Sequence, residues 1–215
     1  MATPRIFVSM GTPYTAAYAS FRDELEDLLR NRCQTDPRIL NKSDYPTGNP
    51  LHKIDEVMRS CDGLVIVAYE RKRVETGIEK RGGRDQKAIS NAIYTTPWNH
   101  VESAMAFTLK IPIYVLVERG LTEECLIESK VDWNVREIDF TVESLRLPEV
   151  HESIATWVRE RVVPHAGKRR GPLEGFLRIR PGEFTIEEWI ALATLAGAIF
   201  AAGVAVGHWL PNFAP

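Results

Sequence analysis

Cysteine is scarce in this chain of 215 residues. The three cysteines form no Cys-x-x-Cys pair and lie at no ligand spacing from a histidine; they are Cys33, Cys61 and Cys125. An odd number without such spacing argues against a disulfide framework and against a zinc site, and it fits a reducing compartment. We therefore expect no resident metal and no bound cofactor.

A strong excess of charge of either sign is also missing. The chain has 27 Lys and Arg against 29 Asp and Glu, for a net charge of −2, and no arginine stripe interleaved with aromatics. This balance argues against nucleic acid as a partner. There is no internal repeat, and the first residues lead directly into a strand pattern without the features of a secretory signal.

Charge is missing altogether from the last 27 residues. Within them, a run of 22 almost purely apolar and small residues extends from Trp189 to Leu210. As a helix this run would be ~33 Å long, enough to cross a hydrocarbon core of roughly 30 Å. The two tryptophans near its ends, Trp189 and Trp209, would suit the headgroup level. We predict a transmembrane helix over residues 187–211.

The charges beside this run predict its orientation. Residues 166–183 hold five cations, Lys168, Arg169, Arg170, Arg178 and Arg180, against two acids. Because Lys and Arg stay on the cytoplasmic side, we expect a single pass through the cell (inner) membrane with the N-terminal domain in the cytoplasm. The predicted organisation is an α/β domain over 1–165, a basic juxtamembrane linker over 166–186 and the membrane helix. Gly203 and Gly207 form a G-x-x-x-G pair through which two such helices could associate.

The first 165 residues alternate apolar runs with helix-period segments. The pattern predicts strands at 6–9, 38–41, 64–68, 113–117 and 136–140, and helices at 18–31, 50–61, 97–110 and 150–162. Such alternation indicates right-handed crossovers and a flavodoxin-like α/β fold, a doubly wound parallel sheet of five strands in the order 2-1-3-4-5. A ligand crevice is then expected above the carboxyl ends of strands 1 and 3, where the winding reverses.

Several segments should converge at this crevice. The loop after the first strand offers small and hydroxylated residues, and the third strand ends in an aromatic; a turn-rich loop at 41–49 adds an acid. The residues that we expect to contact substrate are Ser9, Met10, Gly11, Thr12, Asp44, Tyr69 and Trp98. Gly-Thr-Pro and similar turns also occur without any ligand, so turn chemistry alone explains part of this pattern.

Glu102 is the predicted catalytic residue. It lies four residues after Trp98, so both share one helix face close to the helix N-terminus, which favours an anion. A carboxylate there could stabilise the oxocarbenium-like transition state of N-glycosidic bond cleavage while the aromatic ring stacks on a base. A neutral leaving group such as nicotinamide requires no second carboxylate. The alternative is that Glu102 only stabilises the helix and Trp98 only packs.

Three sequence segments carry a family resemblance. IFVSMGTP, CDGLVIVAYE and TPWNHVESAMAFTLKIPIYVLV resemble the Toll/interleukin-receptor (TIR) fold and the related nucleoside 2-deoxyribosyltransferase-like proteins, over about residues 5 to 163. In both groups a glutamate on the helix after the third strand carries the chemistry, and it aligns with Glu102. The resemblance implies cleavage of NAD, as substrate, at its nicotinamide bond, or nucleobase transfer. For bacterial TIR proteins it also implies antiphage defence and oligomerisation.

The stretch 71–87 is rich in charge, with seven basic residues against three acids. It follows the third strand, so it could act as a lid that attracts phosphates or as a contact to anionic lipid. Its glycines and charges are most typical of a solvated loop, which is what we expect for this stretch.

The leading hypothesis is a membrane-anchored TIR-like enzyme that cleaves the N-glycosidic bond of NAD or a related nucleotide. Its expected partners are a nucleotide, the membrane and further copies of itself. One alternative is a non-catalytic TIR-like signalling, scaffold or nucleotide-sensing module. A further alternative is a nucleoside 2-deoxyribosyltransferase-like enzyme.

Overall fold

The computed structural model describes residues 3–40, 42, 49–122, 124 and 134–169. The chain divides into two compact units, Met1–Lys168 and Arg169–Pro215, and nearly all of the second unit lies outside the described residues. The predicted membrane segment at 187–211 is therefore outside them as well. In the part of the chain that is described, no helix has both the length and the hydrophobicity needed to span a bilayer.

The first unit is built on a parallel sheet of five strands. Its strands lie in the order β2-β1-β3-β6-β7, and every neighbouring pair is parallel. Their bounds are Arg5–Met10 (β1), Asp36–Ile39 (β2), Gly63–Ala68 (β3), Ile113–Glu118 (β6) and Asn134–Ile138 (β7). Because β6 and β7 are the fourth and fifth predicted strands, the predicted order 2-1-3-4-5 and the doubly wound α/β class are confirmed.

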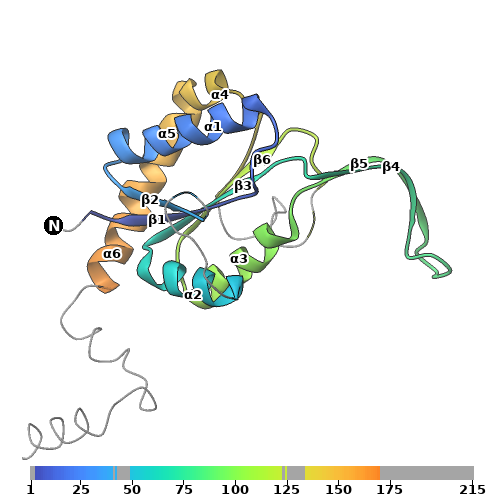
Figure 1. Ribbon diagram of the computed structural model, residues 1–215, viewed down its shortest axis with the longest axis horizontal. Helices are drawn as coiled ribbons and strands as arrows, with labels where there is room; N and C mark the ends of the chain where they lie inside the picture. The colour runs from blue at the N-terminus through green and yellow to red at the C-terminus, as the bar shows by residue number, and fades with distance from the viewer. Residues whose placement is uncertain (1–2, 41, 43–48, 123, 125–133, 170–215) are drawn as a thin grey trace, which may run out of the picture. The chain divides into compact units, whose positions relative to one another are not determined.

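Helices cover both faces of the sheet (Figure 1). One layer contains α1 (Ala16–Asp27), α4 (Val142–Arg146) and α5 (Pro148–Trp157), and the other contains α2 (Pro50–Ser60) and α3 (Pro97–Thr108). The π-helical turn η1 (Leu28–Arg32) extends α1. A second turn, η3 (Val158–Val162), joins α5 to α6 (Val163–Arg169), so the first residues of the predicted linker are helical.

The central strand β3 is buried along its whole length. Val65 and Val67 belong to the core beneath α1 and α5, whereas Leu64, Ile66 and Ala68 belong to the core beneath α2 and α3. Alternate residues of a strand face opposite sides, so a strand covered on both faces must be apolar throughout. This is why the run was recognisable in the sequence.

The edge strands begin and end two residues earlier than predicted. β2 is held at its start by the Asp36 amide, which donates to the Pro4 carbonyl at 2.8 Å, and β7 ends at Ile138. Phe140, predicted to be in the last strand, instead stacks on Phe21 with ring centroids 4.4 Å apart. Pairing partners set the ends of such short strands, and local hydrophobicity does not reveal them.

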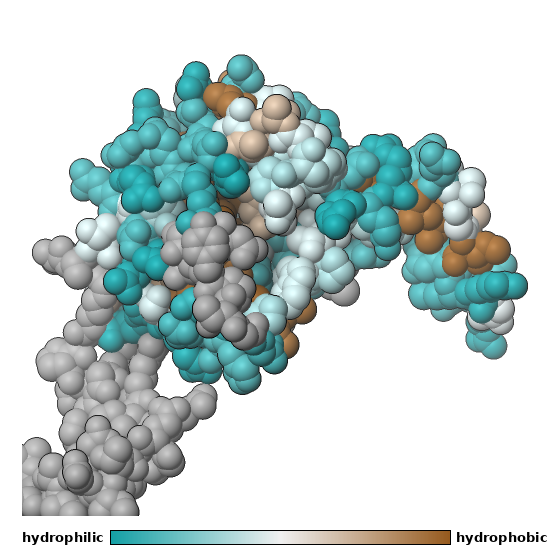
Figure 2. All heavy atoms as spheres, in the orientation of Figure 1, coloured by the Kyte–Doolittle hydropathy of each residue, from teal (hydrophilic) through white to brown (hydrophobic). Residues whose placement is uncertain are grey.

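The stretch after β3 is not the loop that its charges suggested. It forms an antiparallel arm of two strands, β4 (Lys72–Glu79) and β5 (Lys87–Tyr94), which projects from the α/β core (Figure 1). Positive φ angles at Lys80 and Gly82 turn the chain between the strands. Apolar side chains are interspersed with charged ones on the arm surface, and Ile78 is among the exposed ones (Figure 2). The prediction of a solvated loop was wrong because cross-strand pairing, rather than composition, orders this segment.

Candidate functional site

A cleft of about 340 Å³ opens at the carboxyl end of β1, on the side of the sheet that α2 and α3 cover. This volume is in the range of small-ligand sites. Six residues singled out in the sequence line it: Ser9, Met10, Gly11, Thr12, Trp98 and Glu102. The winding of the sheet reverses between β1 and β3, which is where such folds bind ligands. The structure thus brings these six residues together, while their roles stay predictions.

Strand periodicity directs Ser9 toward this cleft. Ser9 shares the face of Phe7, which belongs to the core beneath α2 and α3, because residues two apart in a strand point the same way. Only 1% of the Ser9 surface is exposed, although the residue is polar. A buried hydroxyl of this kind requires hydrogen-bond partners.

Asn99 on α3 supplies one partner for Ser9. Its Nδ2 donates to Ser9 Oγ at 2.8 Å and to the Ser9 carbonyl at 3.2 Å. The Asn99 side chain is itself oriented by the hydroxyl of Thr95, which donates to its Oδ1 at 2.7 Å. Because Ser9 Oγ accepts from Asn99, the single hydroxyl hydrogen of Ser9 remains available for another acceptor.

Glu102 is that acceptor. It lies one helical turn after Asn99, with 5% of its surface exposed. Burial raises the pKa of Glu102 from 4.5 to about 7, and the hydrogen bond from the Ser9 side chain acts in the opposite direction. The carboxyl group is therefore buried at the cleft, accepts a hydrogen bond from the Ser9 side chain and can change its charge near neutral pH.

Trp98 forms an exposed wall of the same cleft. Thr96 caps α3 by accepting from the Trp98 amide, and Pro97 occupies the first turn, so the helix begins directly at the cleft. The indole is 44% exposed. A large aromatic face open to a cleft is a suitable stacking surface for a planar base.

Tyr69 lies behind the cleft and does not line it. Its side chain is buried in an aromatic cluster, 4.4 Å from the Tyr18 ring and 6.1 Å from the Tyr14 ring between centroids. Gly11 lies so close that a Cβ added to it would be 3.1 Å from the Tyr69 hydroxyl oxygen. Tyr69 thus packs beside Gly11 and is not among the residues that line the cleft, and its contact with substrate stays a prediction. Asp44, the other predicted contact, lies outside the described residues.

Asn99 and Thr95 were not predicted from the sequence. The only signal for Asn99 was an asparagine inside a helix, where this residue is unfavourable, one turn before a glutamate. Its partner Ser9 is 90 positions away along the chain. No local pattern connects two such residues.

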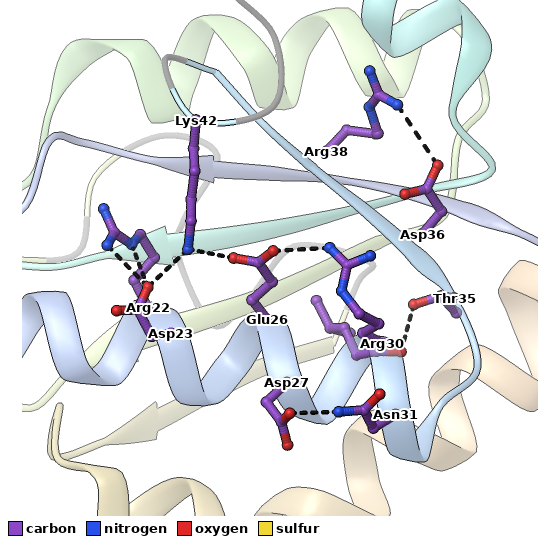
Figure 3. Close-up of polar contacts among 11 residues, drawn as sticks. Arg22, Asp23, Glu26, Asp27, Arg30, Asn31, Thr35, Asp36, Arg38 and Lys42 are labelled. Atoms are coloured by element: carbon purple, nitrogen blue, oxygen red, sulfur yellow. Dashed lines mark hydrogen bonds and ion pairs between the residues drawn. The ribbon is translucent and has the colours of Figure 1, made fainter.

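Two basic residues, Arg22 and Lys42, reach the cleft, and both are already paired with carboxylates. Arg22 donates to Asp23, and Lys42 bridges Asp23 at 2.8 Å and Glu26 at 2.5 Å (Figure 3). The hydrogen bonds to these carboxylates raise the pKa of Lys42. Their charge is thus locally balanced.

A second hollow, of about 860 Å³, adjoins the first. The two share Gly11, Thr12, Pro13, Thr96 and Trp98, so Trp98 stands between them. The base of the β4–β5 arm contributes Arg71 and Lys72 to the second hollow.

Among the residues that the structure describes, no group of three or more His, Cys, Asp or Glu is arranged to hold a metal ion.

Fold and cleft together define a doubly wound α/β protein with a buried carboxyl group at its ligand crevice. No protein-family model and no curated protein matches the chain. Its structure is similar to that of the CMP N-glycosidase BcmB of Clostridium botulinum, with a TM-score of 0.44 and 12% sequence identity. The alignment covers 71% of this chain and 98% of that one. A similarity at this level carries no argument about activity, so function has to be inferred from the cleft itself.

Proposed function

We propose that this protein is an N-ribosyl hydrolase that cleaves the glycosidic bond of NAD or a related nucleotide, with Glu102 as the catalytic carboxylate. The observation that supports this most is the placement of Glu102, which is buried yet lines an open cleft at the switch point of the sheet. A carboxylate turned into bulk solvent would be screened and of little use to a developing cation.

The chemistry follows from charge. Departure of the base leaves positive charge on the ribosyl ring, and an anion in a desolvated site stabilises this transition state more strongly than it stabilises the bound substrate. Water then adds to the ribosyl carbon and loses a proton to solvent, which completes the hydrolysis. Nicotinamide leaves as a neutral molecule, so no proton has to be delivered to it. Ser9 hydrogen-bonds the carboxyl group, Asn99 in turn hydrogen-bonds Ser9, and Trp98 offers a face for the base.

The test uses the full-length chain, purified in a mild detergent because of its apolar C-terminal run. Incubation with NAD should release nicotinamide, and Glu102→Gln should lower the rate by at least about a hundredfold, as expected for loss of a preorganised charge. Glu56→Gln is the matched control, because that side chain is 71% exposed and lies outside the cleft. Equal rates for wild type and Glu102→Gln would refute the proposal.

The same preparation separates the alternatives. Exchange of nucleobases between deoxynucleosides, with no nicotinamide release, would indicate a deoxyribosyltransferase-like enzyme. Nucleotide binding without turnover of either substrate would indicate a non-catalytic signalling or sensing module.

We also propose that residues 187–211 anchor the α/β unit to the inner membrane, facing the cytoplasm. Support comes from the sequence alone: a charge-free run of sufficient length and the cations that precede it. Association of copies through the α/β unit or the Gly203–Gly207 face, and a role in antiphage defence, are proposals of the same standing.

A further inference from the structure

We propose that the second hollow is a phosphate subsite formed by Arg71, Lys72 and the Thr12 and Thr96 hydroxyls, so that the substrate is a nucleotide rather than a free nucleoside. This inference rests on the proposed function, whose substrate class it narrows. It starts from the position of the hollow. Because both hollows share the wall at Trp98 and Thr12, one ligand can occupy both at once.

The two hollows differ in whether their basic residues are already paired with carboxylates. In the first, Arg22 and Lys42 are engaged by Asp23 and Glu26 (Figure 3). A phosphate there would have to compete with carboxylates that already occupy the donors. The first hollow therefore suits the uncharged part of a nucleotide better than its phosphates.

Arg71 and Lys72, at the second hollow, differ from Arg22 and Lys42 in their ion pairing. Within the described part of the chain, neither has a carboxylate at ion-pair distance, although their neighbour Arg73 is paired with Glu70. The Arg71 amide donates to the Tyr94 carbonyl at 2.8 Å, and Lys72 Nζ lies 5.1 Å from the centre of the Tyr94 ring. The pairing of the two arm strands thus holds the backbone of both residues at the second hollow, and among the described residues neither cation is paired with an acid.

Two threonines, Thr12 and Thr96, line the same hollow. Thr96 Oγ1 accepts from the Trp98 amide at 3.4 Å, so its own hydrogen can be donated to a ligand. Thr12 adds a second hydroxyl from the loop after β1. The N-terminus of the 12-residue helix α3 lies here as well and adds positive potential to that of the cations. Arginine, lysine and hydroxyl donors together are a common set for binding phosphate.

This arrangement predicts how a substrate lies. The ribosyl carbon that loses its base sits at Glu102, and the phosphates extend past Trp98 toward the base of the arm. A nucleoside would fill only the first hollow and would lack the contacts to Arg71 and Lys72. The arm, which follows β3 directly, thereby becomes a specificity element of the site.

The first measurement is binding of inorganic pyrophosphate to the full-length chain by calorimetry. Arg71→Gln combined with Lys72→Gln should weaken binding by at least about tenfold, since each charge-assisted hydrogen bond contributes more than a neutral one. The control combines Arg81→Gln with Arg84→Gln, the same change of charge at the exposed turn of the arm. It should alter binding by less than about twofold, because exposed charges act weakly at a distance. Equal losses in both double variants would overturn the subsite.

The second measurement compares hydrolysis of NAD and of nicotinamide riboside. The Arg71/Lys72 variant should raise KM for NAD and leave the riboside unaffected. If wild type cleaves both equally well, the phosphate subsite fails while the hydrolase stands. If wild type cleaves neither substrate but the Arg71/Lys72 variant still binds pyrophosphate more weakly than wild type, the hydrolase proposal fails and the subsite proposal stands.

A lipid headgroup is the other source of phosphate, and vesicles of phosphatidylglycerol distinguish it. Loss of vesicle binding in the Arg71/Lys72 variant, with pyrophosphate binding unchanged, would assign these cations to the membrane and overturn the nucleotide subsite.

Discussion

At the scale of single residues, the burial of Glu102 has a consequence for stability. Its pKa in the folded protein is about 7 against 4.5 for the ordinary carboxyl group, because burial disfavours the charge. Between these two values the unfolded chain is ionised while the folded protein still holds the proton. Stability should therefore fall as pH rises from 4.5 to about 7, and then level off.

Glu102→Gln removes this penalty while keeping the shape of the side chain. We expect the free energy of unfolding of the variant to exceed that of wild type by about 3 kcal/mol at pH 8 and to equal it near pH 4.5. Urea denaturation at both pH values measures the difference. Glu56→Gln, which retains Glu102, should have nearly the same unfolding free energy as wild type at both pH values, because its side chain is 71% exposed. An equal stability of Glu102→Gln and wild type at pH 8 would contradict the burial argument.

The same pKa predicts the pH dependence of catalysis. If ionised Glu102 stabilises the ribosyl cation, kcat/KM for NAD should rise with pH, about tenfold per unit below pH 7, and reach a plateau above it. Initial rates of nicotinamide release between pH 5 and 9 test this. A rate that instead falls above pH 7 would mean that the protonated acid is the active form.

Asn99 is the positioning residue of the site. In Asn99→Ala the buried Ser9 hydroxyl loses its donor and Thr95 loses its acceptor. Each unsatisfied group costs on the order of 1–3 kcal/mol, so the two together should lower the unfolding free energy by about 2–6 kcal/mol. The pH midpoint of kcat/KM should also shift, because Ser9 no longer holds its hydrogen bond to Glu102 firmly. A destabilised variant with an unshifted midpoint would limit Asn99 to folding.

At the scale of elements, the contact between β3 and the helical segment formed by α5 and η3 leaves room only for a glycine at position 63. A Cβ on Gly63 would lie 2.9 Å from Val162 Cγ2 and 3.0 Å from Trp157 Cη2, both on the segment from α5 to η3. Gly63→Ala should lower the free energy of unfolding by about 1–3 kcal/mol, as overpacking does in other cores.

Gly167 on α6 is the matched control for this substitution. Its added Cβ would meet nothing within 4 Å, and alanine is the better helix former by up to about 1 kcal/mol. Gly167→Ala should therefore be neutral or stabilising in the same denaturation experiment. A Gly63→Ala variant as stable as wild type would show that the helix can withdraw from β3.

At the scale of the whole molecule, the apolar segment 187–211 predicts where the α/β unit works. The full-length chain expressed in bacteria should sediment with membranes and resist extraction with sodium carbonate, because its apolar run would have to leave the hydrocarbon core. Deletion of 187–211 should release the chain into the soluble fraction. A reporter fused after Pro215 should lie outside the cytoplasm; finding it in the cytosol would reject the predicted orientation.

Patterns within one element were readable in the sequence. The apolar run of β3 and the Pro97 start of α3 define the order of the elements, and with the rules for parallel sheets they are sufficient for the topology. The ends of β2 and β7 were not readable, because edge strands take their register from a neighbour. The arm was missed because its charges and glycines are also typical of loops, whereas antiparallel pairing holds it together.

Sequence alone therefore determined the doubly wound sheet, the place of its crevice and six of the residues that line it. The tertiary structure decided what those residues experience. In the folded protein Glu102 is buried beside Ser9, and Ser9 is hydrogen-bonded to Asn99, which is 90 positions away along the chain. Tyr69 packs beside Gly11, and Arg71 and Lys72 lie next to the cleft. The physical reason is range: periodicity is a property of neighbouring residues, whereas desolvation and charge depend on groups that only folding brings together.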